Sequence, residues 1–186
     1  MGFMLIPRMV LAPREVWPEL EEQRAGLFSV LFYTVLPISL LPPFMFYNAG
    51  IHHGDAMVAG WSLKPWGDIA AILTAGELIT IAVMGWLIKI VAGGVGSRIS
   101  CHDAYLVAAV APVPLWLSSL SLLIPDLALN VLVILAGLGA SCALMYHGVY
   151  ALGDSDEAIE VASVTHVVMA LLMIAWALLL VPLLLG

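Results

Sequence analysis

The chain has 186 residues, of which 63% are hydrophobic and only 10% are charged, and its mean hydropathy is +1.09. Water-soluble domains are about 45–50% apolar and about 25% charged, so this composition excludes an ordinary soluble fold. The net charge is −7 with six Lys and Arg residues in total. Because these few cations cannot form a basic patch for phosphates, we expect no nucleic-acid partner.

The first 26 residues are predicted to form a cytoplasmic segment that precedes the membrane domain. Apolar residues recur among charged ones, and Pro13 suits a first helical turn, so we predict a short amphipathic helix over residues 13–23. Trp17 would then lie at headgroup level as a membrane-surface anchor. An ordinary juxtamembrane linker is the alternative. The charged residues precede the first apolar run, unlike in a secretory signal peptide, so we expect that run to stay in the mature protein.

Residues 27–186 are predicted to form an all-α, polytopic membrane domain, a bundle of five transmembrane helices. Each apolar run is close to the roughly 20 residues that cross a hydrocarbon core of about 30 Å. The expected spans are 27–47, 67–91, 103–123, 127–150 and 158–185. Prolines interrupt the first span (Pro37, Pro42, Pro43) and the third (Pro112, Pro114). Because the carbonyls that they free need partners, we expect both spans to be kinked and packed inside the bundle.

Basic residues predict how the domain is oriented. Arg8, Arg14 and Arg24 precede the first span, and Lys89 and Arg98 flank the connection between the second and third spans. The remaining cation, Lys64, lies on the other side. The positive-inside rule therefore places the N-terminus in the cytoplasm and, with five spans, the C-terminus in the periplasm or outside the cell.

The most informative polar residue is Glu77, because it lies near the middle of the second span. A carboxylate at bilayer depth costs several kcal/mol unless it is paired, hydrated or protonated. Thr74 and Thr80 are one turn away and are expected to donate to it. His147 and His166 lie in the inner halves of the last two spans, and Glu77 would meet His166 if the second and fifth spans touch. The group is either an ion- or proton-responsive site or hydrogen-bonded glue between helices.

The remaining motifs carry weaker signals. His52-His53-Gly54-Asp55 is expected to be a solvated outer loop and not a metal site. Cys101-His102-Asp103 opens the third span, where Asp103 suits a helix N-terminus; neighbouring side chains do not face each other on a helix, so we expect no catalysis there. Trp116 and Trp176 are expected to anchor span ends at the membrane interface. We predict no cofactor, no metal ion and no enzymatic activity.

Three segments resemble bacterial members of the Yip (Ypt-interacting protein) domain family. They are Leu11-Ala12-Pro13-Arg14-Glu15-Val16-Trp17, the Asp103-Ala104-Tyr105 to Ala111-Pro112-Val113-Pro114 region, and Tyr146-His147-Gly148-Val149-Tyr150-Ala151-Leu152. The resemblance covers nearly the whole chain and implies a five-span protein of the bacterial inner membrane. Eukaryotic relatives bind Rab-type GTPases and carry a long cytosolic amino-terminal region. The resemblance gives no such region to the 26 residues before the first expected span here, so Rab binding is not carried over.

Two function classes remain open at this stage. The resemblance favours a non-enzymatic scaffold or adaptor that sits in the lipid bilayer and binds a membrane or cytoplasmic protein, or a second copy of itself. The alternative is a small transporter or channel for an ion, proton or lipid that uses Glu77, because broken helices and midplane charges often mark transport sites.

Overall fold

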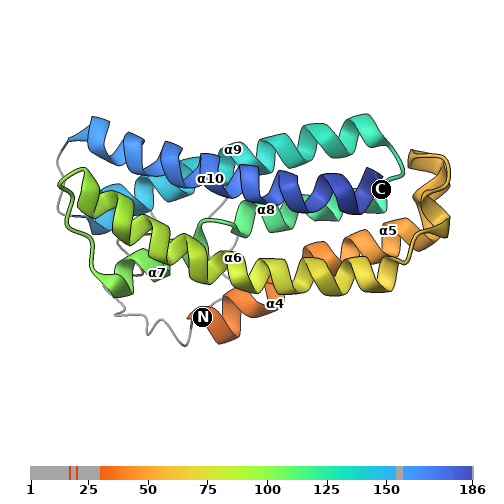
Figure 1. Ribbon diagram of the computed structural model, residues 1–186, viewed down its shortest axis with the longest axis horizontal. Helices are drawn as coiled ribbons and strands as arrows, with labels where there is room; N and C mark the ends of the chain where they lie inside the picture. The colour runs from red at the N-terminus through yellow and green to blue at the C-terminus, as the bar shows by residue number, and fades with distance from the viewer. Residues whose placement is uncertain (1–16, 18–19, 21–29, 154–156, 186) are drawn as a thin grey trace.

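In a computed structural model, the chain folds into a bundle of long helices that run side by side (Figure 1). The structure describes Trp17, Leu20 and residues 30–153 and 157–185. Within those residues, four helical segments are long and apolar enough to cross a membrane: Trp66–Gly94, Cys101–Leu123, Leu127–Leu152 and Ala158–Leu183. The all-α membrane bundle expected from composition is therefore confirmed, with four such segments where five spans were predicted.

The first predicted span, at 27–47, is the one that is not among these four segments, and it takes a different form. A π-helix η2 (Leu31–Val35) leads into a short α4 (Leu36–Ser39), a turn at Leu40 and then α5 (Leu41–Met57). Prolines stand at the starts of both α-helices, where a missing N–H costs least. Helix α5 also continues past the predicted end, so His52-His53-Gly54-Asp55 is helical and not a loop.

This first helical region is interrupted, as its prolines predict, but its expected place inside the bundle is wrong. Phe32 and Phe44 are exposed, and so are Tyr33 and Tyr47. In Figure 1, α4 lies on the outside of the bundle beside α6 (Trp66–Gly94). The buried residues of α5 form only one side of the helix, which is how a peripheral helix packs.

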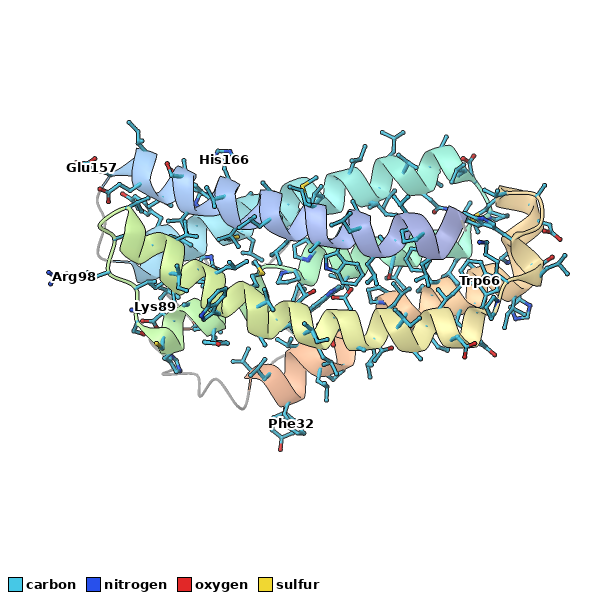
Figure 2. The ribbon with its side chains drawn as sticks, viewed as in Figure 1. Phe32, Trp66, Lys89, Arg98, Glu157 and His166 are labelled. Carbon is cyan, nitrogen blue, oxygen red and sulfur yellow. The ribbon has the colours of Figure 1, made fainter. Side chains whose placement is uncertain are left out.

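The two ends of the bundle carry different residues. Figure 2 shows Lys89, Arg98 and Glu157 together at one end, which we call the Lys89 end, and Trp66 at the other, the Trp66 end. Helix α6 runs from the Trp66 end to the Lys89 end. There, the Lys89 Nζ donates to the Ile99 carbonyl, and Ile99 forms an isolated antiparallel bridge with Gly153. These contacts tie the 95–100 connection to the end of the fourth predicted span.

The central element is the third predicted span, which is broken as expected. It consists of α7 (Cys101–Val110), α8 (Val113–Ser118) and the 3₁₀-helix η4 (Ser119–Leu123). The helix stops at Ala111 because Pro112 and Pro114 have no N–H to continue the ladder. Of its most apolar stretch, 67% is buried inside the protein, against 22–28% for the other three long segments. The expectation that this span is kinked and interior is confirmed.

Two long helices, α9 (Leu127–Leu152) and α10 (Ala158–Leu185), complete the bundle. Helix α9 packs along both α7 and α8, and α10 packs between α6 and α9. Asp126 caps α9 by accepting from the Leu129 amide. Near the middle of α9, Gly137 lies so close to Ser118 and the Pro114 carbonyl that an added Cβ would clash. A glycine there lets α9 approach the broken span closely.

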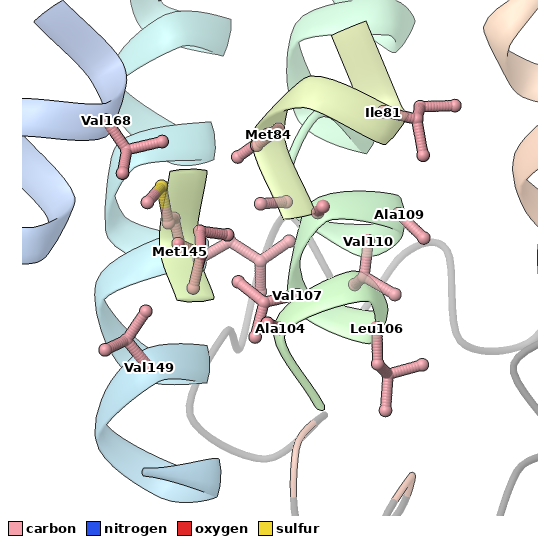
Figure 3. Close-up of a cluster of buried hydrophobic side chains, with 14 of the residues drawn as sticks. Ile81, Met84, Ala104, Leu106, Val107, Ala109, Val110, Met145, Val149 and Val168 are labelled. Atoms are coloured by element: carbon pink, nitrogen blue, oxygen red, sulfur yellow. The ribbon is translucent and has the colours of Figure 1, made fainter. Parts of the chain in front are cut away.

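The core lies around α7, and small residues let its neighbours come close. Ala104, Val107 and Val110 of α7 belong to one buried cluster with Met145 and Val149 of α9, and Met84 and Val168 join it from α6 and α10 (Figure 3). Many large apolar side chains point outward instead, among them Ile79, Leu132, Leu135, Ile174 and Leu178. Such an outward apolar surface suits lipid contact and would be an aggregation hazard in water.

Candidate functional site

Glu77 is bound by an indole from the broken central span. The Nε1 of Trp116 donates to the Glu77 Oε2 at 2.7 Å, joining α6 to α8. Trp116 is 1% exposed and Glu77 is half-buried. Trp116 can reach α6 because it stands two residues after Pro114, where the chain has restarted as α8. A hydrogen bond from an indole N–H is one way to accommodate a carboxyl group within an apolar bundle.

A second indole donates to the same helix one turn further on. The Nε1 of Trp176 on α10 donates to the Thr80 Oγ1 at 3.0 Å. Gly76 makes room for this contact, because its missing side chain leaves space for the ring of Trp176 and for Leu179. The Thr74 hydroxyl was expected to donate to Glu77, but it donates to the Ala70 carbonyl of its own helix at 2.8 Å. Glu77 and Thr80 thus form a polar strip on α6 that two tryptophans bind.

The structure does not bring His166 to Glu77. Helices α6 and α10 do touch, but Thr80 is level with Trp176. His166 precedes Trp176 by ten residues, about 15 Å along the axis at 1.5 Å per residue, toward the Lys89 end. Its side chain is exposed and points away from the bundle (Figure 2). The second and fifth predicted spans therefore do touch, but their register along the helix axes keeps His166 away from Glu77.

His147 lies in a different environment, at the Lys89 end of α9. It is half-buried and lines a groove of about 440 Å³ together with Tyr146, Tyr150, Ala151 and Ala158. The ring of Tyr146 meets its imidazole edge-on, with centroids 5.5 Å apart. Glu77 does not line this groove. The three predicted ion- or proton-responsive residues therefore occupy three separate places.

Trp17 is enclosed by the bundle, where the sequence predicts a membrane-surface anchor. Its side chain is 0% exposed and belongs to the core cluster, as does that of Leu20, while the rest of the predicted helix 13–23 lies outside the described residues. The indole lies against Gly148 of α9, where an ideal Cβ would be 2.5 Å from the Trp17 Cζ2. A residue that the bundle encloses cannot serve as a lipid anchor, because its ring has no surface left for headgroups.

The turn after α5 is organised around Asp55. Its carboxylate accepts from the Gly60 and Ser62 amides at 2.9 and 3.2 Å and from the Ser62 hydroxyl. These bonds hold the pKa of Asp55 below its usual value of 3.8, and the bond from the Ser62 hydroxyl has the largest effect. Gly60 adopts a φ of +85°, which favours glycine. The described residues include no group of three or more His, Cys, Asp or Glu placed to hold a metal ion.

The Cys101-His102-Asp103 sequence forms a capped helix start. The Ser100 Oγ accepts from the Asp103 amide at 3.1 Å and also bonds the Asp103 carboxylate at 2.5 Å. Asp103 thus has the helix-terminal role expected from sequence. The His102 Nδ1 is 3.3 Å from the Asp103 Oδ1, and Cys101 is an exposed free thiol.

The sequence interpretation missed the indole donors. The positions of Trp116 and Trp176 near span ends predict interface anchors, yet both indoles donate inside the bundle to α6. Their depth offered a signal, because both lie in the same half of the membrane as Glu77 when residues are counted from the Trp66 end. Ser141 was also missed; its Oγ accepts from the Leu115 amide at 3.1 Å across the α8–α9 contact.

Comparison with known proteins gives one match. The family model of the Yip1 domain matches residues 8–183, which is nearly the whole chain. No curated protein and no solved structure matches significantly.

Proposed function

This chain belongs to the Yip1 domain family, and on that premise we propose that it is a non-enzymatic membrane scaffold or adaptor. The observation that carries the proposal is the hydrogen bond between Glu77 and Trp116, which joins two helices. The carboxylate, the most informative polar residue of the predicted spans, binds a nearly fully buried indole on a neighbouring helix. Polar groups used in this way fix how helices pack. A bundle held rigid in the membrane suits a protein that presents a surface to a partner.

The proposal includes a fifth span built from η2, α4 and α5. Together they cover Leu31–Met57, longer than a hydrocarbon core of about 30 Å requires, so that the last turn of α5, which contains Asp55, extends beyond the core. Exposed aromatic residues along them, Phe32 and Tyr33 at one end and Phe44 and Tyr47 further on, would face lipid. With five spans, the N-terminus is in the cytoplasm and the C-terminus is outside, in the inner membrane of a bacterium.

The proposed contact surface is the Lys89 end, which then faces the cytoplasm. Its described parts are the 93–102 connection, Gly153 and residues 157–160, while most of the other segment expected from sequence, 13–24, lies outside the described residues. Arg98 is exposed there and points away from the bundle (Figure 2). The contacts between Lys89, Ile99 and Gly153 hold the surface in shape. A protein partner of the membrane or cytoplasm, or a second copy of the chain, would bind this surface.

The experiment that tests the adaptor is purification of the full chain from its native membrane in nanodiscs, followed by mass spectrometry of what stays bound. We expect a stoichiometric protein partner that is lost in Arg98→Glu. The matched control is Lys64→Glu, which reverses a charge at the opposite end. Loss of the partner in both variants, or a protein that carries no partner in its native membrane, would count against the adaptor.

A transporter for an ion, proton or lipid is the second candidate, and one observation favours it. Glu77 is held by Trp116, which directly follows the break in the central span, so movement of α8 would change the access to the carboxylate. Flux through liposomes that contain the purified protein distinguishes the candidates. Flux that Glu77→Gln abolishes, with the variant still folded, would support transport; equal flux in protein-free liposomes would oppose it.

A further inference from the structure

A groove of about 320 Å³ lies on the outside of the bundle, where the first helical region meets α6. Residues of η2, α4 and α6 line it, together with Tyr105 of α7. Two of the lining residues, Val35 and Ile81, are buried, whereas Phe32 and Leu78 are exposed, as in a concave surface with a floor and a rim. Every lining residue other than Tyr105 is apolar, so the groove suits a hydrocarbon chain.

Tyr105 gives this groove one polar group at a fixed place. Its ring packs against Gly85 of α6, where an ideal Cβ would be 2.5–2.8 Å from three ring atoms. The Tyr105 hydroxyl makes no hydrogen bond to the part of the chain that the structure describes. Gly85 follows Ile81 by one turn, which at 1.5 Å per residue places the ring about 6 Å nearer the Lys89 end. The hydroxyl can therefore donate to a polar group at that end of a bound chain.

The same face of α6 carries a cation one turn beyond Gly85. The residues that follow one another on this face, at intervals of four, three and four, are Leu78, Ala82, Gly85 and Lys89. Lys89 is exposed at the end of the bundle (Figure 2). Its Nζ donates to the Ile99 carbonyl, and an ammonium group has two further N–H donors. An apolar groove, a hydroxyl and a cation thus succeed one another toward the Lys89 end.

We propose that this groove binds one phospholipid of the membrane leaflet at the Lys89 end. Its acyl chain lies in the groove, an ester carbonyl accepts from the Tyr105 hydroxyl, and its phosphate pairs with Lys89. Chain, ester and phosphate follow one another in this order toward the surface of a membrane. Contact with bulk lipid needs only an apolar surface, whereas a concave site with polar groups at fixed depths selects one molecule.

This site is separate from Glu77, which does not line the groove. The inference therefore goes beyond both proposed functions and does not depend on either, because it requires only that the bundle stands in a bilayer.

The binding test uses the full chain, purified and stripped of lipid in detergent, titrated with phosphatidylglycerol and followed by native mass spectrometry. We expect one lipid to bind more tightly than any that follow. Ala82→Phe places a ring in the groove and should weaken this binding about tenfold or more, because the added ring takes up the space of the chain. The matched control is Ala143→Phe, another exposed alanine, on α9. Equal affinities of these two variants would overturn the site.

Two conservative substitutions test the polar contacts. Tyr105→Phe keeps the ring on Gly85 and should weaken binding about fivefold, the typical net effect of one hydrogen bond. Its control is Tyr150→Phe, which removes a hydroxyl from α9 at the same end of the bundle. An affinity of Tyr105→Phe that equals that of Tyr150→Phe would overturn the ester contact and, with it, the proposed placement of the lipid.

The phosphate is tested with diacylglycerol, which has the chains and esters of phosphatidylglycerol but no phosphate. The native chain should prefer phosphatidylglycerol. Lys89→Gln should remove this preference and still fold, because the Gln amide can donate to the Ile99 carbonyl. Equal binding of the two lipids to the native chain would show a site for hydrocarbon alone and overturn the phospholipid as its ligand.

Discussion

At the scale of single residues, the Glu77–Trp116 hydrogen bond shows how this bundle accommodates a carboxylate. The indole N–H is a neutral donor, so it adds no charge of its own to the bundle. It also satisfies the Trp116 N–H, which would otherwise be buried without a partner. One contact therefore removes two unfavourable groups and holds α6 to α8.

Trp116→Phe should destabilise the bundle by about 1–3 kcal/mol, because it keeps the aromatic ring and leaves Glu77 without its donor. Glu77→Gln should cost less, since the amide oxygen can still accept from Trp116. Unfolding in bicelles by a denaturing detergent measures both. The control is Trp86→Phe, which changes a side chain that is 55% exposed. Equal stability of Trp116→Phe and Trp86→Phe would show that the hydrogen bond contributes nothing.

Asp55 gives the turn after α5 a dependence on pH. Because the folded pKa is lowered, the carboxylate stabilises the turn above its usual pKa, and this stabilisation is lost as the pH falls through the folded value. The turn should be held at neutral pH and loosen below about pH 4. Amide exchange at Gly60 and Ser62 measures this change. In Asp55→Asn the dependence should disappear; persistence of the same acid transition would exclude Asp55 as its cause.

At the scale of elements, the break between α7 and α8 determines what the central span can contact. The prolines end one helix and begin another, and the Leu115 amide at the restart donates to Ser141 on α9. Further along, the Ser118 and Ser119 hydroxyls donate to carbonyls three residues earlier, at Leu115 and Trp116. The Leu115 amide, which the break leaves without its helical partner, is thus satisfied by a hydroxyl, as burial away from water requires.

Ser141→Ala should therefore destabilise the bundle by about 1–3 kcal/mol, the cost of a buried amide left without a partner. Ser163→Ala is the matched control, because the Ser163 hydroxyl only donates to the Ile159 carbonyl of its own helix. Detergent-induced unfolding compares the two variants. A Ser141→Ala protein as stable as Ser163→Ala would mean that the Leu115 amide finds another acceptor or water.

At the scale of the whole molecule, the question is which end faces the cytoplasm. If the proposed five-span topology holds, the exposed thiol of Cys101 at the Lys89 end should react with a membrane-impermeant maleimide only in inverted vesicles. A Leu63→Cys variant that also carries Cys101→Ser should react only in right-side-out vesicles, because Leu63 is 88% exposed beyond the opposite end. The reverse pattern would invert the orientation, and labelling of both sites from one side would refute the bundle as a spanning unit.

Much of this architecture is predictable from local chemistry. Apolar runs of spanning length predict the last four long segments within a few residues, because lipid selects for length and composition alone. Pro112 and Pro114 predict the central break, because proline cannot donate to the helix ladder. The place of Asp103 in the first turn of α7 follows from the preference of helix N-termini for acidic residues. The first segment was predicted less well, because several nearby prolines leave the helix ends ambiguous.

The sequence by itself thus determined the membrane class, the central break and the residue whose burial needs an explanation, Glu77. Only the tertiary structure decided its partner. Composition placed His166 at bilayer depth, but the register of α6 against α10 puts Trp176 beside Thr80 and turns His166 outward. The sequence pattern predicts Trp17 as a lipid anchor, whereas in the fold its ring packs against Gly148 and is buried. Spacing along a chain fixes depth and helix face, whereas rotation and register between helices depend on packing at many positions at once.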